Sequence, residues 1–356
     1  MRIRAFFFTI ILCVLLITGC VQKKVIDDIN IATGIGVDQA ENGLLLGSVM
    51  IPEFKPDKSI ENFSFTAEGE IMRDVMSQMQ QKASQPILAG SLDIALFNEE
   101  IARNGIIQIL DVFLRDPSVG ARVQLAVVDG KAVEVFEGNY GDRGNALYLR
   151  ELIEHNMKGG NLPVANLHRF LFDFYQKGKD PYLPYLKKQD DDLVSLRGIA
   201  LFKDEKVVDI LHENKMFYFK LLVDRFTMGT IMVKEGHGNA TVKSIKSDTD
   251  MKLIKRDPYE ITINIDVKGI LTEHEGIRLA KDEANKIEKL LEKQVNKECQ
   301  ALLTEFQENK IDPIGIGHFV KTKTRQFDFE KWETDFQNAT FNVNTNIDIV
   351  EVGVVE

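Results

Sequence analysis

The chain has 356 residues, of which 44% are hydrophobic and 28% are charged, a balance that is typical of globular proteins. Its 54 acidic and 44 basic residues give a formal net charge of −10, which argues against nucleic-acid binding and against electrostatic adhesion to anionic lipid. A chain of this length is expected to divide into about two or three domains.

The N-terminal segment is organised like the signal peptide of a bacterial lipoprotein. Two arginines precede an apolar run over residues 6–17, and Gly19 and Cys20 follow that run. The run is too short for a helix to cross about 30 Å of hydrocarbon. A cysteine after a small residue resembles the lipobox, in which the cysteine sulfur receives a diacylglyceryl group. We predict a signal peptide over residues 1–19 and a lipidated tether over residues 20–30; an ordinary signal peptide with a chance cysteine is the alternative.

The cysteine count predicts that the mature chain has no intramolecular disulfide. Cys13 leaves with the signal peptide and Cys20 carries the lipid, which leaves Cys299 alone. Cys299 lies in a strongly helical pattern and is expected to be a buried, small hydrophobic residue instead of a reactive thiol.

Residues 31–175 are predicted to form an N-terminal α/β-type domain, in which apolar runs indicate strands and helical spacing of apolar residues indicates helices. The expected strands are residues 31–38, 43–51, 92–97, 123–128 and 132–136. The last two flank Asp129-Gly130, the strongest hairpin sequence in the chain. The expected helices are residues 68–85, 99–114, 146–157 and 164–175, and residues 52–63 are expected to be a loop.

Residues 176–192 are predicted to be an interdomain linker. They combine Asp180-Pro181 and Leu183-Pro184 with a pair of lysines and a run of three aspartates. The aspartate run lacks the spaced oxygen ligands of a calcium loop, so it is expected to be a solvated acidic segment.

Residues 193–356 are predicted to form a C-terminal α+β region, which could divide into two subdomains near residue 270. The expected strands are residues 198–202, 206–211, 230–233, 240–246, 261–268 and 341–349, with a helix near residues 213–223. One long helix is expected over residues 272–309, with an apolar stripe from Ile277 to Phe306. The stripe is rich in alanine, which favours a helix laid across its own sheet over a coiled-coil dimer. The predicted fold class is α+β and multi-domain, with mixed or antiparallel sheets flanked by helices.

Catalytic and cofactor motifs are missing from the sequence, and we predict a protein that is not an enzyme and has no cofactor or metal. The six histidines are His155, His168, His212, His237, His274 and His318. No two of them have the spacing of metal ligands on a helix. Gly34-Ile35-Gly36 lacks the third glycine of a dinucleotide fingerprint and runs into Val37-Asp38, not into a helix.

The segment Asp312-Pro313-Ile314-Gly315-Ile316-Gly317 has two interpretations. Its glycines could form an anion-binding loop with exposed backbone amides. The favoured interpretation is a helix start, with Asp312 at the cap, Pro313 next, and a cap contribution of about 1 kcal/mol to stability. Asp312 would then accept the amide near Gly315, and the glycines would let this helix approach the long one.

Four segments in order give the whole chain a resemblance to the Ger(x)C family, the C-subunit lipoproteins of nutrient germinant receptors. They are "INIATGIGVDQ" behind the cysteine, "IALFNEEIARNGIIQILDVFLRDP", "GIALFKDEKVVDIL", and "DPIGIGHFV" after the long helix. The chain departs from the family at Val21, where the family usually has tryptophan just after the lipidated cysteine.

The resemblance implies a non-enzymatic lipoprotein of several α+β domains on the outer face of the inner spore membrane. Cys20 would hold it in the bilayer through the diacylglyceryl group, and it would assemble with the receptor's A and B membrane subunits, without nucleic acid. It would be required for nutrient-triggered spore germination. The alternatives are a solute-binding lipoprotein of a transporter, which usually has two similar lobes, and an envelope enzyme such as a wall hydrolase.

Overall fold

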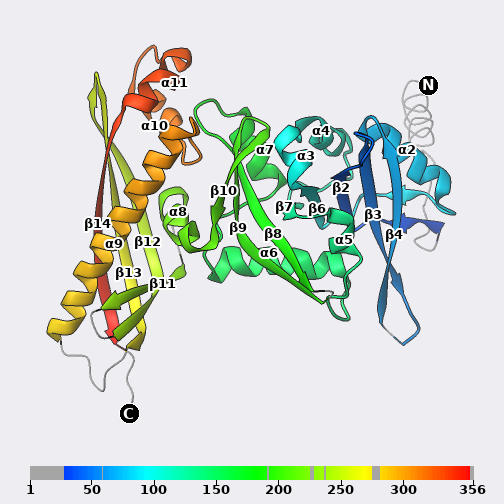
Figure 1. Ribbon diagram of the computed structural model, residues 1–356, viewed down its shortest axis with the longest axis horizontal. Coiled ribbons are helices and arrows are strands. Elements are labelled where there is room, and N and C mark those ends of the chain that lie inside the picture. Colours follow the sequence, from blue (N-terminus) through cyan, green and yellow to red (C-terminus); the bar gives the residue numbers. More distant parts are fainter. Residues whose placement is uncertain are drawn as a thin grey trace, which may run out of the picture.

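The structure, a computed structural model, describes the chain in six stretches. These are residues 28–57, 59–190, 192–224, 228–235, 238–274 and 281–352. The described strands form an eight-stranded, a four-stranded and a two-stranded sheet. The two larger sheets follow one another along the longest axis of the molecule, with α8 (Met216–Val223) between them (Figure 1). The predicted α+β class with mixed sheets and flanking helices is confirmed.

The eight-stranded sheet has the order β10-β9-β8-β7-β6-β2-β3-β4. Its strands are β2 (Gly34–Gln39), β3 (Leu45–Phe54), β4 (Ile60–Gly69), β6 (Ile94–Asn98), β7 (Gln124–Asp129), β8 (Tyr182–Asp190), β9 (Leu193–Lys203) and β10 (Lys206–His212). The strands β2, β6, β7 and β8 run parallel, and the outer pairs are antiparallel. A small parallel pair, β1 (Asn30–Ile31) and β5 (Ile87–Leu88), lies beside it.

Helices cover both faces of this sheet, which explains its apolar central strands. The helices of one face are α2 (Met72–Lys82), α3 (Glu99–Asn104), α4 (Ile107–Arg115) and α7 (Leu167–Tyr175). The helices of the other face are α5 (Ala132–Phe136) and α6 (Asn145–Gly159). Each face has its own apolar core. In β6, Ala95 and Phe97 point into the core with α2, α3, α4 and α7, and Ile94 and Leu96 point into the core with α5 and α6. All four side chains are fully buried.

The four-stranded sheet carries the long helix on one face. Its strands are β11 (Gly229–Glu235), β12 (Gly238–Arg256), β13 (Tyr259–His274) and β14 (Thr340–Val352). The helices of this region are α9 (Lys281–Glu308), α10 (Ile316–Lys323) and α11 (Phe329–Asn338). Ile287, Leu291 and Val295 of α9 are buried in one core with Ile263 and Ile347 of the sheet. The helix therefore lies across its own sheet, as predicted.

The helix α8 joins the cores of the two large sheets. It follows a 3₁₀ turn at Glu213–Lys215, and all its residues except the last are buried. Lys220 is buried there, and its Nζ donates to the carbonyls of Met157 (3.0 Å), Gly160 (2.7 Å) and Met228 (3.0 Å). These three bonds satisfy every donor of the ammonium group, although burial lowers the pKa of Lys220. Buried residues of α8 and of both large sheets belong to one continuous apolar core.

The predicted linker over residues 176–192 is wrong, because most of it is strand β8. Tyr182, Leu183, Tyr185 and Leu186 are buried, and β8 lies in the sheet between β7 and β9. The prolines suggested a linker, yet Pro184 is in register with Ile199 in the strand pair. The free energy gained by burying side chains on both faces of β8 outweighs the hydrogen bond that is lost because Pro184 has no backbone N–H.

The predicted hairpin at Asp129-Gly130 is also wrong, because residues 132–136 form the helix α5. The carboxylate of Asp38 accepts hydrogen bonds from the amides of Ala132 (2.6 Å) and Val133 (3.0 Å). Asp38 lies near the end of β2, 94 residues before Ala132, so no local pattern could indicate this cap.

Four further boundaries differ from the predictions. The expected loop over residues 52–63 is mostly the extended ends of β3 and β4. The expected helix over residues 99–114 is interrupted at Gly105, whose φ is 121°, and the amide of Ile106 there donates to the carbonyl of Glu205 (3.1 Å).

The long helix begins later than predicted, because Thr272 still belongs to the strand β13. That strand passes unbroken through residue 270, which contradicts a division there.

Two glutamates of α9 protect the outer edge of β14. The Oε1 atom of Glu292 accepts from the amide of Ile347 (3.1 Å), and the Oε1 atom of Glu288 accepts from the amide of Ile349 (2.8 Å). The strand is outermost in its sheet, and unpaired amides on such an edge can pair with another chain.

Replacing both Glu288 and Glu292 by alanine is expected to increase self-association, because the two edge amides lose their acceptors. Light scattering over a range of protein concentrations would show a higher average mass than for the parent chain. The control is the double variant Glu298→Ala/Glu308→Ala, which removes the same charge from the same helix. Equal association of both double variants would contradict edge protection.

Candidate interaction surface

The predicted lipidation site lies outside the described residues. Cys20, the signal peptide over residues 1–19 and the first part of the tether precede Asp28, where the description begins. Lipidation of Cys20 therefore stays a prediction. In the part of the chain that the structure does describe, no helix is both long and apolar enough to cross a bilayer.

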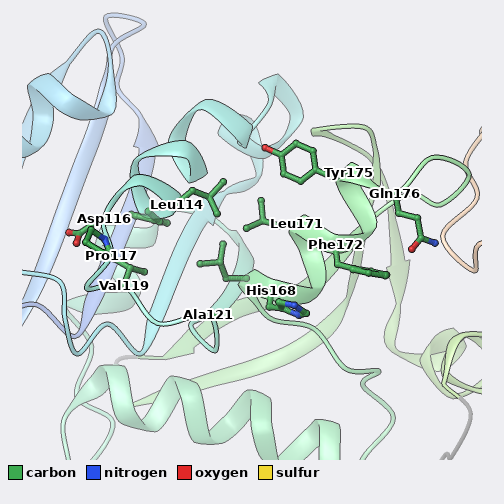
Figure 2. Close-up of a pocket in the computed structure, with 12 residues that line it drawn as sticks. Leu114, Asp116, Pro117, Val119, Ala121, His168, Leu171, Phe172, Tyr175 and Gln176 are labelled. Carbon is green, nitrogen blue, oxygen red and sulfur yellow. The ribbon is translucent and has the colours of Figure 1, made fainter.

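An apolar groove lies between α4 and α7, and we call it the α4–α7 groove. It has a volume of about 660 Å³ and is open to solvent. Figure 2 shows Leu114 of α4 and Leu171 of α7 across from each other, with Val119 below them and Tyr175 at one end. The connecting loop is held in shape by Asp116, whose Oδ1 accepts from the amide (2.9 Å) and hydroxyl (2.6 Å) of Ser118.

The groove exists because α7 has more apolar residues than one buried face can hold. Its sequence LHRFLFDFY buries Leu167, Phe170 and Leu171 against the sheet. Phe172 and Tyr175 then point outward and are 51% and 66% exposed. Together with Leu114, they form a contiguous apolar surface of the kind that marks interaction sites.

Cationic and aromatic groups border the groove. The ring of His168 stacks on Phe172 with centroids 6.4 Å apart, and the Arg169 guanidinium lies 5.9 Å from the same ring. His168 is thus a packing residue at the surface. The sequence did not indicate the groove itself, because its two walls are more than 50 residues apart in the chain.

The Asp312 segment forms a buried junction between the two large sheets. The Asp312 Oδ1 accepts from the amides of Gly315 (2.8 Å) and Ile316 (2.9 Å), and its Oδ2 accepts from the amide of Gly317 (2.6 Å). The predicted bond to Gly315 is present, but the N-cap of α10 is Gly315, with a φ of 82°. The helix therefore begins three residues beyond the predicted position.

The glycines of this segment approach the end of α7 instead of the long helix. A Cβ at Gly317 would meet the Trp332 ring and the Cα of Gly178. The carbonyl of Gly178 accepts from the amide of His318 (2.9 Å), and the amide of Asp180 donates to the carbonyl of Asp312 (2.9 Å). The favoured structural interpretation holds, with a different partner from the one predicted.

A chain of buried charges connects the junction to α7. Asp173 pairs with Arg169 (2.9 Å) and Lys179 (3.3 Å), and Asp180 Oδ2 accepts from the Asp312 amide (2.7 Å). Burial raises the pKa of Asp173 and of Asp180, and burial lowers the pKa of Lys179. These opposite shifts are what desolvation imposes on acids and bases.

Burial raises the pKa of Asp312 to about 7, although its three amide hydrogen bonds act in the opposite direction. A folded-state pKa above the ordinary value of 3.8 means that this group stabilises the fold at low pH. The contribution is lost as pH rises through about 7.

We expect the free energy of unfolding to decrease from pH 5 to pH 8, in part because Asp312 ionises. Asp312→Asn removes the titration while keeping one oxygen acceptor, so its stability should depend less on pH. Urea unfolding at several pH values would measure both slopes, with Asp328→Asn as the control at an exposed cap. Parallel slopes for the parent chain and Asp312→Asn would contradict the assignment.

In the part of the chain that the structure describes, no group of three or more His, Cys, Asp or Glu residues is placed to hold a metal ion.

Cys299 is buried and free, as predicted, and burial raises the pKa of its thiol. A Cβ at Gly34 or Gly36 would meet Phe136 of α5. The glycine pair therefore makes room for that helix on the sheet.

Comparisons with known proteins agree over the whole chain. Residues 22–188 match the family described as "Spore germination protein N-terminal domain", and residues 197–353 match "Spore germination B3/ GerAC like, C-terminal". Spore germination protein GerQC of Bacillus cereus is 33% identical over 98% of each chain. Spore germination protein B3 of Bacillus subtilis is 21% identical over 98% of this chain and 97% of the relative. The crystal structure of the GerBC protein superposes with a TM-score of 0.61 at 18% identity, covering 89% of this chain and 97% of that one, and so supports the fold.

Proposed function

Because the chain belongs to the Ger(x)C family of spore germination proteins, we propose that it is the C subunit of a nutrient germinant receptor. It is a non-enzymatic lipoprotein that Cys20 holds on the outer face of the inner spore membrane. Its partners are the receptor's A and B membrane subunits and the bilayer, and it binds no nucleic acid. Its function is to enable nutrient-triggered germination.

The observation that carries this proposal is similarity from one end of the chain to the other. The relative GerQC covers both matched family regions and nearly the whole length of this chain. The lipobox-like sequence ahead of Cys20 supplies an anchor, and two acyl chains would make it stable. The α4–α7 groove supplies an apolar surface for a protein contact.

The direct test is recovery of a tagged chain from detergent-extracted spore membranes. The A and B subunits should copurify with it, and spores that lack the chain should fail to respond to nutrients. The same spores should still germinate with agents that bypass receptors. Normal responses of the deletion spores to every nutrient, together with no copurifying membrane subunit, would refute the proposal.

The alternative of a solute-binding lipoprotein fits the fold less well. That class usually has two similar lobes, whereas the two large sheets here have eight and four strands. Among the described residues, only the smaller sheet carries a helix of 28 residues. Isothermal titration with nutrients separates the two functions, because micromolar binding by the isolated chain would favour the solute binder.

The α4–α7 groove gives a residue-level test of subunit assembly. Leu114→Ser/Tyr175→Ser should lower copurification of the membrane subunits by about tenfold or more, since exposed apolar anchors each contribute roughly 1 kcal/mol or more to such contacts. The matched control is Phe54→Ser/Met232→Ser, which removes two exposed apolar residues elsewhere. Equal losses in both variants would exclude the groove as the contact surface.

A further inference from the structure

A cluster of cations surrounds a hollow between β12 and α10. The hollow has a volume of about 950 Å³. The cations that line it, which we call the basic patch, are Lys252, Lys255, Arg256 and Lys323. The only acidic residue in the lining is Asp250. The overall net charge of the chain is negative, so this surface departs from the general character of the protein.

Contacts within the fold hold these cations together. The Nη2 atom of Arg256 donates to the carbonyl of Lys323 (2.8 Å), which ties β12 to α10. The Nζ atom of Lys323 lies 5.8 Å from the ring of Phe319. No ion pair with another described residue neutralises any of the four cations. Asp250 lines the hollow and Glu260 is opposite Lys255 in the strand pair, so four cations face fewer acidic groups and still favour an external anion.

Apolar side chains lie among the cations of the basic patch. Ile254 lies between Lys252 and Lys255 in the strand and is 58% exposed. Phe319 lines the same hollow and is only partly buried. A surface that combines cations with exposed apolar groups matches the boundary between headgroups and acyl chains of an anionic membrane. An acidic polypeptide would satisfy the charges but would leave Ile254 in water.

The position of the basic patch suits a second membrane contact. Figure 1 shows the C-terminal sheet and the N-terminal strands β2, β3 and β4 at opposite ends of the longest axis. The proposed lipid on Cys20 precedes these N-terminal strands by few residues in the sequence. A second contact at the far end would lay the long axis along the membrane, and the anchor would raise the effective concentration of the patch at the surface.

We infer that the basic patch binds the anionic phospholipid headgroups of the membrane surface. Each Lys or Arg near an anionic surface strengthens binding by about fivefold. The orientation of the molecule rests on the proposed lipid anchor, whereas headgroup binding itself does not. The negative overall charge predicts no adhesion to such lipid, and the basic patch is the local exception.

The test uses the chain from residue 21 onward, without the signal peptide and lipid, and measures cosedimentation with vesicles. Vesicles of phosphatidylcholine with about one third phosphatidylglycerol should bind the chain, and pure phosphatidylcholine vesicles should not. Binding should weaken at high salt, because ions screen surface charge. Lys252→Gln/Lys255→Gln/Lys323→Gln should bind about a hundredfold more weakly; Arg256 is kept for its bond to α10.

The matched control is Lys289→Gln/Lys293→Gln/Lys297→Gln, which removes three exposed cations from α9. This variant should bind vesicles like the parent chain. Equal binding to both kinds of vesicle, or equal loss in both triple variants, would overturn the inference. Binding to polyglutamate but not to anionic vesicles would overturn it in favour of an acidic protein partner. Because this assay uses no lipidated protein and no spores, its failure would leave the receptor function untouched.

Discussion

Spores that carry Cys20→Ala are expected to lose the response to nutrients, and the protein should be uncleaved or shed from the membrane. The physical reason is that the proposed diacylglyceryl group would be attached to the Cys20 sulfur, which alanine lacks. Two acyl chains give a stable anchor, whereas an unlipidated chain would have to rely on weak surface contacts. Membrane fractionation, palmitate labelling and nutrient-triggered germination would be measured together.

The chain offers a matched control in Cys299→Ala. Cys299 is buried in the core, so this variant also loses one thiol but keeps the proposed anchor. It should be labelled with palmitate and retained like the parent chain. Normal membrane retention of Cys20→Ala, combined with no palmitate in the parent protein, would show that the N-terminal sequence is not a lipobox.

Asp312→Ala should destabilise the fold by about 3 kcal/mol, well above the cost of losing an ordinary N-cap. Its carboxylate is the acceptor for three buried amides, those of Gly315, Ile316 and Gly317. Alanine would leave the amides of Ile316 and Gly317 without a partner in a buried site, and the amide of Gly315 would keep only the main-chain carbonyl of residue 312 (3.3 Å). Urea unfolding can be followed by the fluorescence of Trp332, the single tryptophan of the chain, which is buried beside Gly317.

Asp328→Ala provides the comparison for Asp312→Ala. Asp328 caps α11 by accepting from the amides of Glu330 and Lys331, and these bonds are exposed. Water can replace its carboxylate, so the loss should be about 1 kcal/mol. If the two variants lose the same stability, burial of the junction contributes nothing beyond a normal cap.

Local patterns in the sequence predicted the periodic elements but not the contacts between distant segments. The stripe on α9 and the alternation in β14 were predictable because each needs only the spacing of its own residues. Asp312 was identified as a cap because its amide partners follow within five residues. Asp38 caps α5 across 94 residues, and no spacing rule covers such a distance.

The predicted linker is wrong because Pro184, although proline is typical of turns, here lies in a buried strand. Pro181 and Pro184 indicated a break in the chain, yet Tyr182 and Leu186 between and after them are buried in the sheet. The α4–α7 groove was missed for a related reason. The exposed Phe172 and Tyr175 of α7 look like core residues in sequence, and only the packed fold leaves them uncovered.

The β8–β9 hairpin limits how relatives of this protein can exchange parts. The two matched family regions end at residue 188 and begin at residue 197, so their boundary cuts through a pair of hydrogen-bonded strands. A chimaera joined there would combine a β8 and a β9 of different parentage, and α8 would meet an unfamiliar sheet. Recombination between germination proteins should therefore succeed outside this hairpin, where a crossover leaves both strands from one parent. The segment that has to be exchanged as a whole therefore extends beyond either of the two matched family regions.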